Sequence, residues 1–128
     1  MPKSSVAEVM TRKVVYLPEG TTLDEAAQAM RDEAIGDVVV TSGPTILGVV
    51  TDRDIVIRAI AEGLSPKDTT LSAITSRELI MVEQSATVDE AVQAMRDRGV
   101  RRLVVCDSDR KVVGILSLTD VAMLPTSV

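Results

Sequence analysis

One short pattern of residues occurs twice in the chain. It consists of a glycine, two apolar residues, a serine or threonine and, three positions later, an aspartate, and it spans Gly48–Asp54 and Gly114–Asp120. A hydroxyl group can donate a hydrogen bond to a phosphate oxygen, and a carboxylate can accept hydrogen bonds from two neighbouring hydroxyl groups of a sugar. This combination suits the binding of a sugar phosphate, and the candidate residues are Thr51, Asp54, Ser117 and Asp120.

Each pattern lies where an apolar segment passes into a predicted helix. The first turn of a helix presents unpaired N–H groups and the positive end of the helix dipole to an anion, and the glycine allows the backbone to approach a ligand closely. The same Ser/Thr-x-x-Asp spacing also forms a capping box, which needs no ligand. Either copy alone favours the cap, whereas the occurrence of both copies after Gly-apolar-apolar favours a binding site.

The composition excludes several classes of function. The 128 residues include no histidine and a single cysteine, Cys106, which excludes Ser-His and Cys-His nucleophiles, His-bound metals and a disulfide within the chain. A net charge of −5, with one tyrosine and no tryptophan or phenylalanine, argues against binding to nucleic acid or to an anionic membrane. No apolar run approaches the ~20 residues of a membrane-spanning helix. We therefore expect a cytoplasmic protein without enzymatic activity or a metal site, in which Cys106 is a small apolar strand residue.

The two patterns belong to a duplication that covers most of the chain. The segment Thr22–Asp32 returns 65 residues later as Thr87–Asp97. A repeat of this length is too long for a solenoid unit and indicates a duplicated small domain. One half alone would be only marginally stable, so we expect the two halves to pack on each other around aliphatic cores.

Each repeat is predicted to contain a β-α-β-β-α unit after a single helical turn. Thr22 and Thr87 each have a glutamate three residues later, which is the spacing of a capping box and predicts a helix start. Strong β-formers on either side of turn residues predict a hairpin after that helix. In the first repeat the expected elements are Ser5–Met10, Lys13–Leu17, a helix after Thr22, Asp37–Thr41, Ile46–Val50 and a helix over Asp52–Glu62 that stops at Gly63. In the second they are Thr70–Ile74, Glu78–Val82, a helix after Thr87, Arg102–Cys106, Val112–Leu116 and a helix after Ser117.

This order of elements and the double Gly-apolar-apolar-[Ser/Thr]-x-x-Asp pattern resemble a pair of cystathionine-β-synthase (CBS) domains, known together as a Bateman module. Val9–Thr11 and Leu103–Val105 also match what that family shows. The resemblance covers the chain from Ser5 to Leu124, with one domain at 5–64 and the other at 70–124. It implies an α+β fold in which the two domains pack sheet against sheet with pseudo-two-fold symmetry.

In the family that the chain resembles, the clefts between paired domains bind adenosine-containing ligands such as AMP, ADP, ATP or S-adenosylmethionine. By position, the two aspartates of the pattern, Asp54 and Asp120, would hold ribose hydroxyls. Its hydroxyl residues, Thr51 and Ser117, would meet the phosphate or the edge of the ribose. Two strand segments would flank the base, which adds the candidate residues Val15, Tyr16, Ile80 and Met81.

The two repeats differ where the charge of a ligand would be felt. The second repeat has an arginine pair, Arg101 and Arg102, before a strand, whereas the first has Gly36 and Asp37 there. Two guanidinium groups can bind a phosphate through charge-assisted bonds, so we expect the cleft with the arginine pair to take the phosphorylated ligand. The cleft near Asp37 is expected to be weaker, empty, or suited to an uncharged or cationic ligand. Arg53 is a third candidate phosphate contact, and all three arginines could instead be solvated surface residues.

Together these features favour a non-enzymatic sensor of adenine nucleotides, and hence of cellular energy, that regulates another protein chain. The expected ligands are AMP, ADP or ATP, with S-adenosylmethionine and NAD as further candidates. No cofactor is required, although Mg²⁺ can accompany ATP. The resemblance also implies a homodimer, because two Bateman modules commonly associate into a disk. The alternative is a structural dimerisation or scaffold module without a nucleotide ligand, in which the Ser/Thr-x-x-Asp segments serve only as helix caps.

Overall fold

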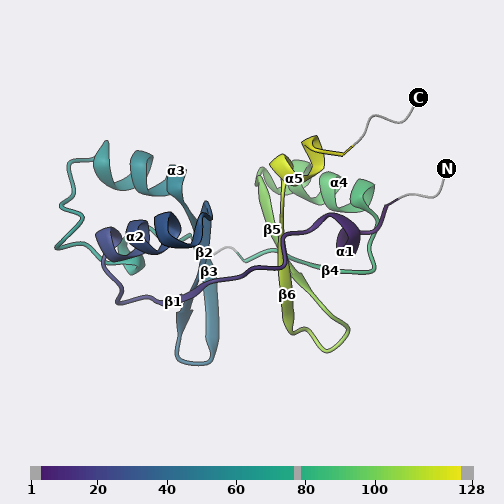
Figure 1. The fold of residues 1–128 in the computed structure, drawn as a ribbon, viewed down its shortest axis with the longest axis horizontal. Coiled ribbons are helices and arrows are strands. Elements are labelled where there is room, and N and C mark those ends of the chain that lie inside the picture. The colour runs from purple at the N-terminus through teal and green to yellow at the C-terminus, as the bar shows by residue number, and fades with distance from the viewer. Residues whose placement is uncertain (1–3, 77–78, 125–128) are drawn as a thin grey trace. The chain divides into compact units, whose positions relative to one another are not determined.

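The computed structural model describes residues 4–76 and 79–124 of the chain. The chain divides into two compact units (Figure 1). The first-repeat unit consists of residues 15–79, and the second-repeat unit consists of residues 1–14 together with residues 80–128. These units differ from the sequence repeats, 5–64 and 70–124, because the leading segment of each repeat (residues 5–14 or 70–79) belongs to the unit of the other repeat.

The first-repeat unit is built on a three-stranded sheet in the order β1-β2-β3. Its strands are β1 (Tyr16–Pro18), β2 (Asp37–Ser42) and β3 (Thr45–Thr51). β1 is parallel to β2, and β2 and β3 form an antiparallel hairpin. The helices are α2 (Leu23–Glu33), α3 (Asp52–Ile55), the π-helix η1 (Val56–Ile60) that continues α3, and the 3₁₀-helix η2 (Leu71–Ala73). The β-α-β-β-α order predicted from the sequence is confirmed.

The second-repeat unit repeats this topology with a second three-stranded sheet in the order β4-β5-β6. Its strands are β4 (Met81–Glu83), β5 (Arg102–Cys106) and β6 (Val112–Ser117). β4 is parallel to β5, and β5 and β6 are antiparallel. The helices are α1 (Val6–Val9), α4 (Val88–Arg98) and α5 (Leu118–Ala122).

The leading segments are attached to their units by equivalent contacts. In the second-repeat unit, α1 packs against α4, and the N–H of Val6 donates to the carbonyl of Ala86 at 2.8 Å. In the first-repeat unit, the N–H of Leu71 donates to the carbonyl of Thr21 at 2.9 Å. Val6 and Leu71 are both fully buried, so each leading segment supplies a side chain to the core of the unit that it joins.

Capping residues and left-handed residues determine where the two long helices begin and end. Thr22 and Thr87 cap α2 and α4 as predicted, because each threonine and the glutamate three residues later exchange hydrogen bonds between side chain and backbone. α2 is followed by Ala34 and α4 is followed by Gly99, which adopt left-handed conformations with φ of 54° and 65°. A left-handed residue at this position stops a helix.

Each unit has its own aliphatic core. In the first-repeat unit, the apolar face of α2 meets alternate residues of the sheet and the side chains of the leading segment: Leu23, Ala26, Met30, Val38, Val40, Val50, Leu71 and Ile74. The core of the second-repeat unit includes Val6, Met10, Ala91, Met95, Leu103, Val105 and Leu116. Cys106 is a buried free cysteine on β5, which agrees with its interpretation as an apolar strand residue.

The second helix of the first repeat differs from the sequence prediction. A single helix was expected over Asp52–Glu62, but the α-helix ends at Ile55 and the chain widens into the π-helix η1. Gly63, with φ of 75°, follows η1 and agrees with the predicted stop. π-Helical turns are uncommon and place side chains where a regular helix would not.

Two strands are shorter than predicted. β1 and β4 begin at Tyr16 and Met81, later than the expected starts at Lys13 and Glu78. Of these residues, Glu78 lies outside the described part of the chain. Within residues 4–76 and 79–124, no helix combines the length and the apolar character needed to cross a membrane.

Candidate functional site

The predicted binding residues of the first repeat gather at one end of its sheet. Asp37 begins β2 and is paired with Thr51, the last residue of β3. Tyr16 begins β1 and is paired with Val39, whose N–H donates to the carbonyl of Val15 at 2.9 Å. These strand ends, with the start of α3, form what we call the first half-site: Val15, Tyr16, Asp37, Thr51, Arg53 and Asp54.

The second repeat shows the same arrangement. Arg102 begins β5 and is paired with Ser117, the last residue of β6. Met81 is paired with Val104, whose N–H donates to the carbonyl of Ile80 at 3.0 Å. These strand ends, with the start of α5, form the second half-site: Ile80, Met81, Arg101, Arg102, Ser117 and Asp120.

Both Ser/Thr-x-x-Asp segments form capping boxes. The N–H of Asp54 donates to Thr51 Oγ1 at 3.0 Å, and the N–H of Thr51 donates to Asp54 Oδ2 at 2.9 Å. The corresponding distances between Asp120 and Ser117 are 3.1 and 3.0 Å. The capping interpretation of these residues is therefore confirmed. These residues keep further hydrogen-bonding capacity, because a carboxylate can accept about four hydrogen bonds and a hydroxyl that accepts one can still donate its own proton.

The backbone N–H groups at the start of α3 are not free for an anion. The N–H of Asp52 donates to the carbonyl of Gly36 at 3.0 Å, and the N–H of Arg53 donates to Asp52 Oδ1 at 2.8 Å. The N–H of Asp54 is taken by Thr51, as described above. The expectation of unpaired N–H groups was therefore wrong for this helix, and the recognition of an anion here depends on side chains.

The glycines of the two patterns allow another part of the chain to approach. A Cβ atom on Gly48 would overlap the carbonyl oxygen of Ser76, and one on Gly114 would lie 2.7 Å from the carbonyl oxygen of Thr11. Ser76 and Thr11 belong to the two leading segments, and Thr11 forms an antiparallel bridge with Ile115 of β6. The glycines were expected to make room for a ligand, but the structure shows that they make room for backbone.

Thr11 contacts the carboxylate of the second half-site. Its hydroxyl donates to Asp120 Oδ1 at 3.2 Å, with Oδ2 at 3.4 Å. Its backbone is held against β6 by reciprocal N–H to carbonyl bonds with Ile115, both 2.9 Å. Thr11 was noted in the sequence only as part of the Val9–Thr11 match, and its contact with Asp120 was missed because the two residues are 109 positions apart.

Arg58 contacts the carboxylate of the first half-site. Its Nε lies 3.8 Å from Asp54 Oδ1, and its Nη1 donates to the carbonyl of Ile74 at 3.1 Å. The sequence offered a signal for this contact, since residues four apart on a helix face each other. The two aspartates of the repeated pattern thus have different partners. Asp120 accepts a hydrogen bond from the neutral hydroxyl of Thr11, and Asp54 forms an ion pair with Arg58.

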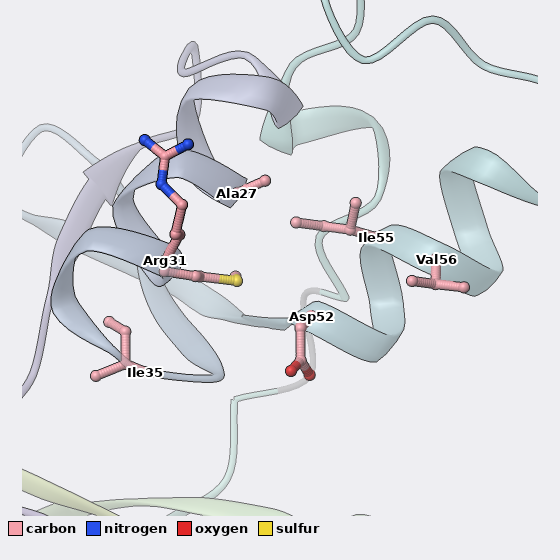
Figure 2. A pocket seen from close by; sticks show the side chains of 7 residues that line it. Ala27, Arg31, Ile35, Asp52, Ile55 and Val56 are labelled. Atoms are coloured by element: carbon pink, nitrogen blue, oxygen red, sulfur yellow. The ribbon is translucent and has the colours of Figure 1, made fainter.

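The structure also contains a pocket of about 350 Å³ beside the first half-site (Figure 2). It lies between α2 and α3 and is lined by Ala27, Met30, Arg31, Ile35, Asp52, Ile55 and Val56. Arg31 and Asp52 point in different directions in Figure 2, and Arg31 forms an ion pair with Asp32 at 2.9 Å. The hydrogen bond from Arg31 to Asp32 raises the pKa of Arg31 above its usual value. The pocket is mainly apolar and does not include the Thr51 hydroxyl or the Asp54 carboxylate, so the chemistry predicted from the sequence lies outside it.

Comparison with known proteins identifies both repeats. A model of the CBS domain matches residues 6–60 and again residues 71–125. A protein of similar sequence, the uncharacterized protein MK0525 of Methanopyrus kandleri, is 36% identical over 122 residues, which are 94% of this chain and 62% of that protein. The chain therefore spans somewhat less than two thirds of that relative.

Solved structures show the same fold. A conserved protein of Pyrococcus horikoshii superposes with a TM-score of 0.84 at 26% identity, covering 99% of this chain and 100% of that one. The CBS domain protein PAE2072 of Pyrobaculum aerophilum, which was solved in complex with AMP, gives a TM-score of 0.80 at 29% identity, covering 94% and 92%. These matches confirm the α+β fold class.

Proposed function

Because the chain belongs to the CBS domain family and carries two tandem copies of the domain, we propose that it is a non-enzymatic regulatory module that binds an adenine nucleotide. The observation that carries the proposal is the position of Arg102, Ser117 and Asp120 at one end of a sheet. A guanidinium group beside a hydroxyl and a carboxylate is complementary to a phosphate beside a ribose. The AMP bound to the similar protein PAE2072 supports the choice of an adenosine ligand.

In the proposed complex, the second half-site binds the ligand more strongly. Asp120 accepts hydrogen bonds from the ribose hydroxyls, and Ser117 donates its proton to the phosphate or the edge of the ribose. Arg102, with the exposed Arg101, binds the phosphate, while the start of β4 flanks the base. The first half-site binds more weakly because Asp37 stands where the second has Arg102. Mg²⁺ accompanies the ligand only when it is ATP.

The proposed output of binding is a change in the association with another protein, through which the module reports the cell's energy state. A ligand can cause such a change only by binding one conformation of the chain more tightly than another. We also propose that the chain forms a homodimer in the cytoplasm. The apolar side chains of Val56, Ile57 and Ile60 on η1 are each at least half exposed, and an exposed apolar patch is typical of an association surface.

A scaffold without a ligand is the second candidate function. The observation that favours it is the complete pairing of the first-turn N–H groups of α3, together with a capping box in each repeat. Under this alternative, Thr51, Asp54, Ser117 and Asp120 only start helices. Arg102 then contributes surface charge and no affinity for nucleotides.

A panel of thermal unfolding measurements separates the two candidates. The panel contains AMP, ADP, ATP, GTP, NAD and S-adenosylmethionine, each with and without Mg²⁺. A ligand at about 100 times its dissociation constant adds about 2.7 kcal/mol to the free energy of unfolding, which raises the melting temperature by several degrees. A shift with adenine ligands and none with GTP supports the sensor. No shift with any ligand supports the scaffold.

A further inference from the structure

Arg58 is held at two points beside the first half-site. Its Nε lies 3.8 Å from the Asp54 carboxylate, and its Nη1 donates to the carbonyl of Ile74, the residue that ends η2. The bond to Ile74 uses one of the five N–H donors of the guanidinium group, whereas the 3.8 Å contact with Asp54 is an ion pair without a hydrogen bond. The side chain is 50% exposed, so the anchored guanidinium group is open to solvent on one side.

The position of Arg58 compensates for the charge difference between the half-sites. In the second half-site the cation comes from the strand, because Arg102 is paired with Ser117. In the first half-site that position is Asp37, and the cation comes from the helix as Arg58. The second repeat has Leu124 four residues after its motif aspartate, where the first repeat has Arg58. Besides Arg53 in the first half-site and Arg101 in the second, each half-site therefore has a further arginine near its motif, supplied by the helix in the first (Arg58) and by the strand in the second (Arg102).

We propose that Arg58 is the specificity-determining residue of the first half-site and that it makes this half-site select a phosphorylated nucleoside over an uncharged one. This inference rests on the proposed function. Without Arg58, the carboxylates of Asp37 and Asp54, which repel a phosphate group, would be opposed by Arg53 alone among the residues of this half-site. With it, the charge of Asp54 is offset, and the remaining guanidinium N–H groups can form charge-assisted hydrogen bonds with phosphate oxygens. The first half-site is then weak because of Asp37, but it does not prefer uncharged or cationic ligands.

The test compares AMP with adenosine by isothermal titration calorimetry of the full chain carrying both Asp120→Ala and Arg102→Ala, which together remove the carboxylate and the strand guanidinium group of the second half-site. In this background, Arg58→Leu introduces the residue that the second repeat has at the equivalent position. It is expected to weaken AMP binding about tenfold, which is the effect of about one charge-assisted hydrogen bond. Its affinity for adenosine should change less than about twofold. Arg58→Lys keeps the charge and should retain part of the preference for AMP. Arg31→Leu removes an equal charge from α2 in the same unit and should leave the ratio of the two affinities unchanged.

Each result decides the question. An equal loss of AMP and adenosine binding in Arg58→Leu would show that Arg58 only ties η1 to η2, and unchanged AMP binding would remove it from the site altogether. If Asp120→Ala with Arg102→Ala abolished AMP binding before Arg58 was changed, the first half-site would hold no nucleotide and the inference would be overturned while the proposed function stood. If the unsubstituted chain bound no AMP, the proposed function itself would be overturned, together with this inference.

Discussion

Arg102 and Ser117 are paired across β5 and β6 at the register position where β2 and β3 pair Asp37 with Thr51. Directly opposed residues of an antiparallel pair have their side chains on the same face of the sheet, about 5 Å apart. The charged side chain that lies across from the hydroxyl of the motif is therefore negative in the first-repeat unit and positive in the second-repeat unit. Because one repeat has an arginine where the other has an aspartate, the local electrostatic potential differs between the two half-sites.

The first prediction concerns the relative strength of the half-sites. Asp120→Ala and Arg102→Ala should each weaken AMP binding by about tenfold or more, because each removes hydrogen bonds that involve a charged group. Asp54→Ala should weaken it less. Titration calorimetry with AMP and adenosine also distinguishes the roles, since Arg102→Ala should spare adenosine and Asp120→Ala should not. If Asp54→Ala were the most damaging change, the second half-site would not be the stronger one.

The second prediction concerns the close approach of the Thr11 backbone to Gly114 in β6. Gly114→Ala places a Cβ atom 2.7 Å from the carbonyl oxygen of Thr11, a contact that the backbone can relieve only by moving. We expect the free energy of unfolding to fall by about 1–3 kcal/mol, as for other overpacked positions. Gly20→Ala is the matched control, since no heavy atom lies within 4 Å of its Cβ position, and it should change stability by less than about 1 kcal/mol. Urea denaturation followed by circular dichroism measures both, and equal effects would argue that Gly114 is not constrained by Thr11.

The third prediction concerns pH. The hydroxyl of Thr22 donates to Glu25 Oε1 at 2.6 Å and its N–H donates to the same oxygen at 3.2 Å, and these bonds hold the pKa of Glu25 below its ordinary value. Because the folded protein lowers the pKa, the contribution of Glu25 to stability is complete above the ordinary value and is lost as the pH falls through the lowered one.

Glu25→Gln should therefore lower the melting temperature at neutral pH, and its difference from the unsubstituted chain should shrink as the solution is acidified. Thermal unfolding from neutral pH to about pH 3, a range that spans the ordinary glutamate pKa, measures the difference. A difference that stayed constant or grew in acid would contradict the assignment of the pKa shift to the capping box.

The fourth prediction concerns self-association. If the exposed apolar side chains of η1 form the dimer surface, the double substitution Val56→Glu and Ile60→Glu should give a monomer, since burying two carboxylates without partners is costly. Met123→Glu is the control, because Met123 on the other unit is also apolar and is 80% exposed. Size-exclusion chromatography with light scattering reports the mass. A dimer that survived the double substitution would place the interface elsewhere.

The elements and the helix caps could be predicted because their signals are local. Thr22 and Thr87 stand three residues from their glutamates, and the pattern of the hairpins is visible within single strands. The pairing of Asp37 with Thr51 also follows once the hairpin register is known. The proximity of the strand ends and the following helix start in each unit could therefore be predicted from the chain, whereas the binding role of these residues stays a prediction.

The contacts that the sequence did not reveal are those that depend on distant segments. Thr11 reaches Asp120 across 109 positions, and the carbonyl of Gly36 takes the N–H that was expected to be free at Asp52. The widening into η1 was also missed, because the sequence of Val56–Ile60 is equally compatible with a regular helix. Arg58 had a local signal, because it stands four residues after Asp54 in a predicted helix.

Because the leading segments are exchanged, the repeated unit of the sequence (residues 5–64 or 70–124) differs from the unit that folds around one core. A chain with only one repeat would lack its partner's leading segment, so its core would have no counterpart of Val6 or Leu71 from the other repeat. Such a chain could complete its fold by exchanging leading segments with a second copy, which is a form of domain swapping. Residues 1–64 expressed alone should accordingly be dimeric in gel filtration, and a folded monomer would show that one repeat completes its core without such an exchange.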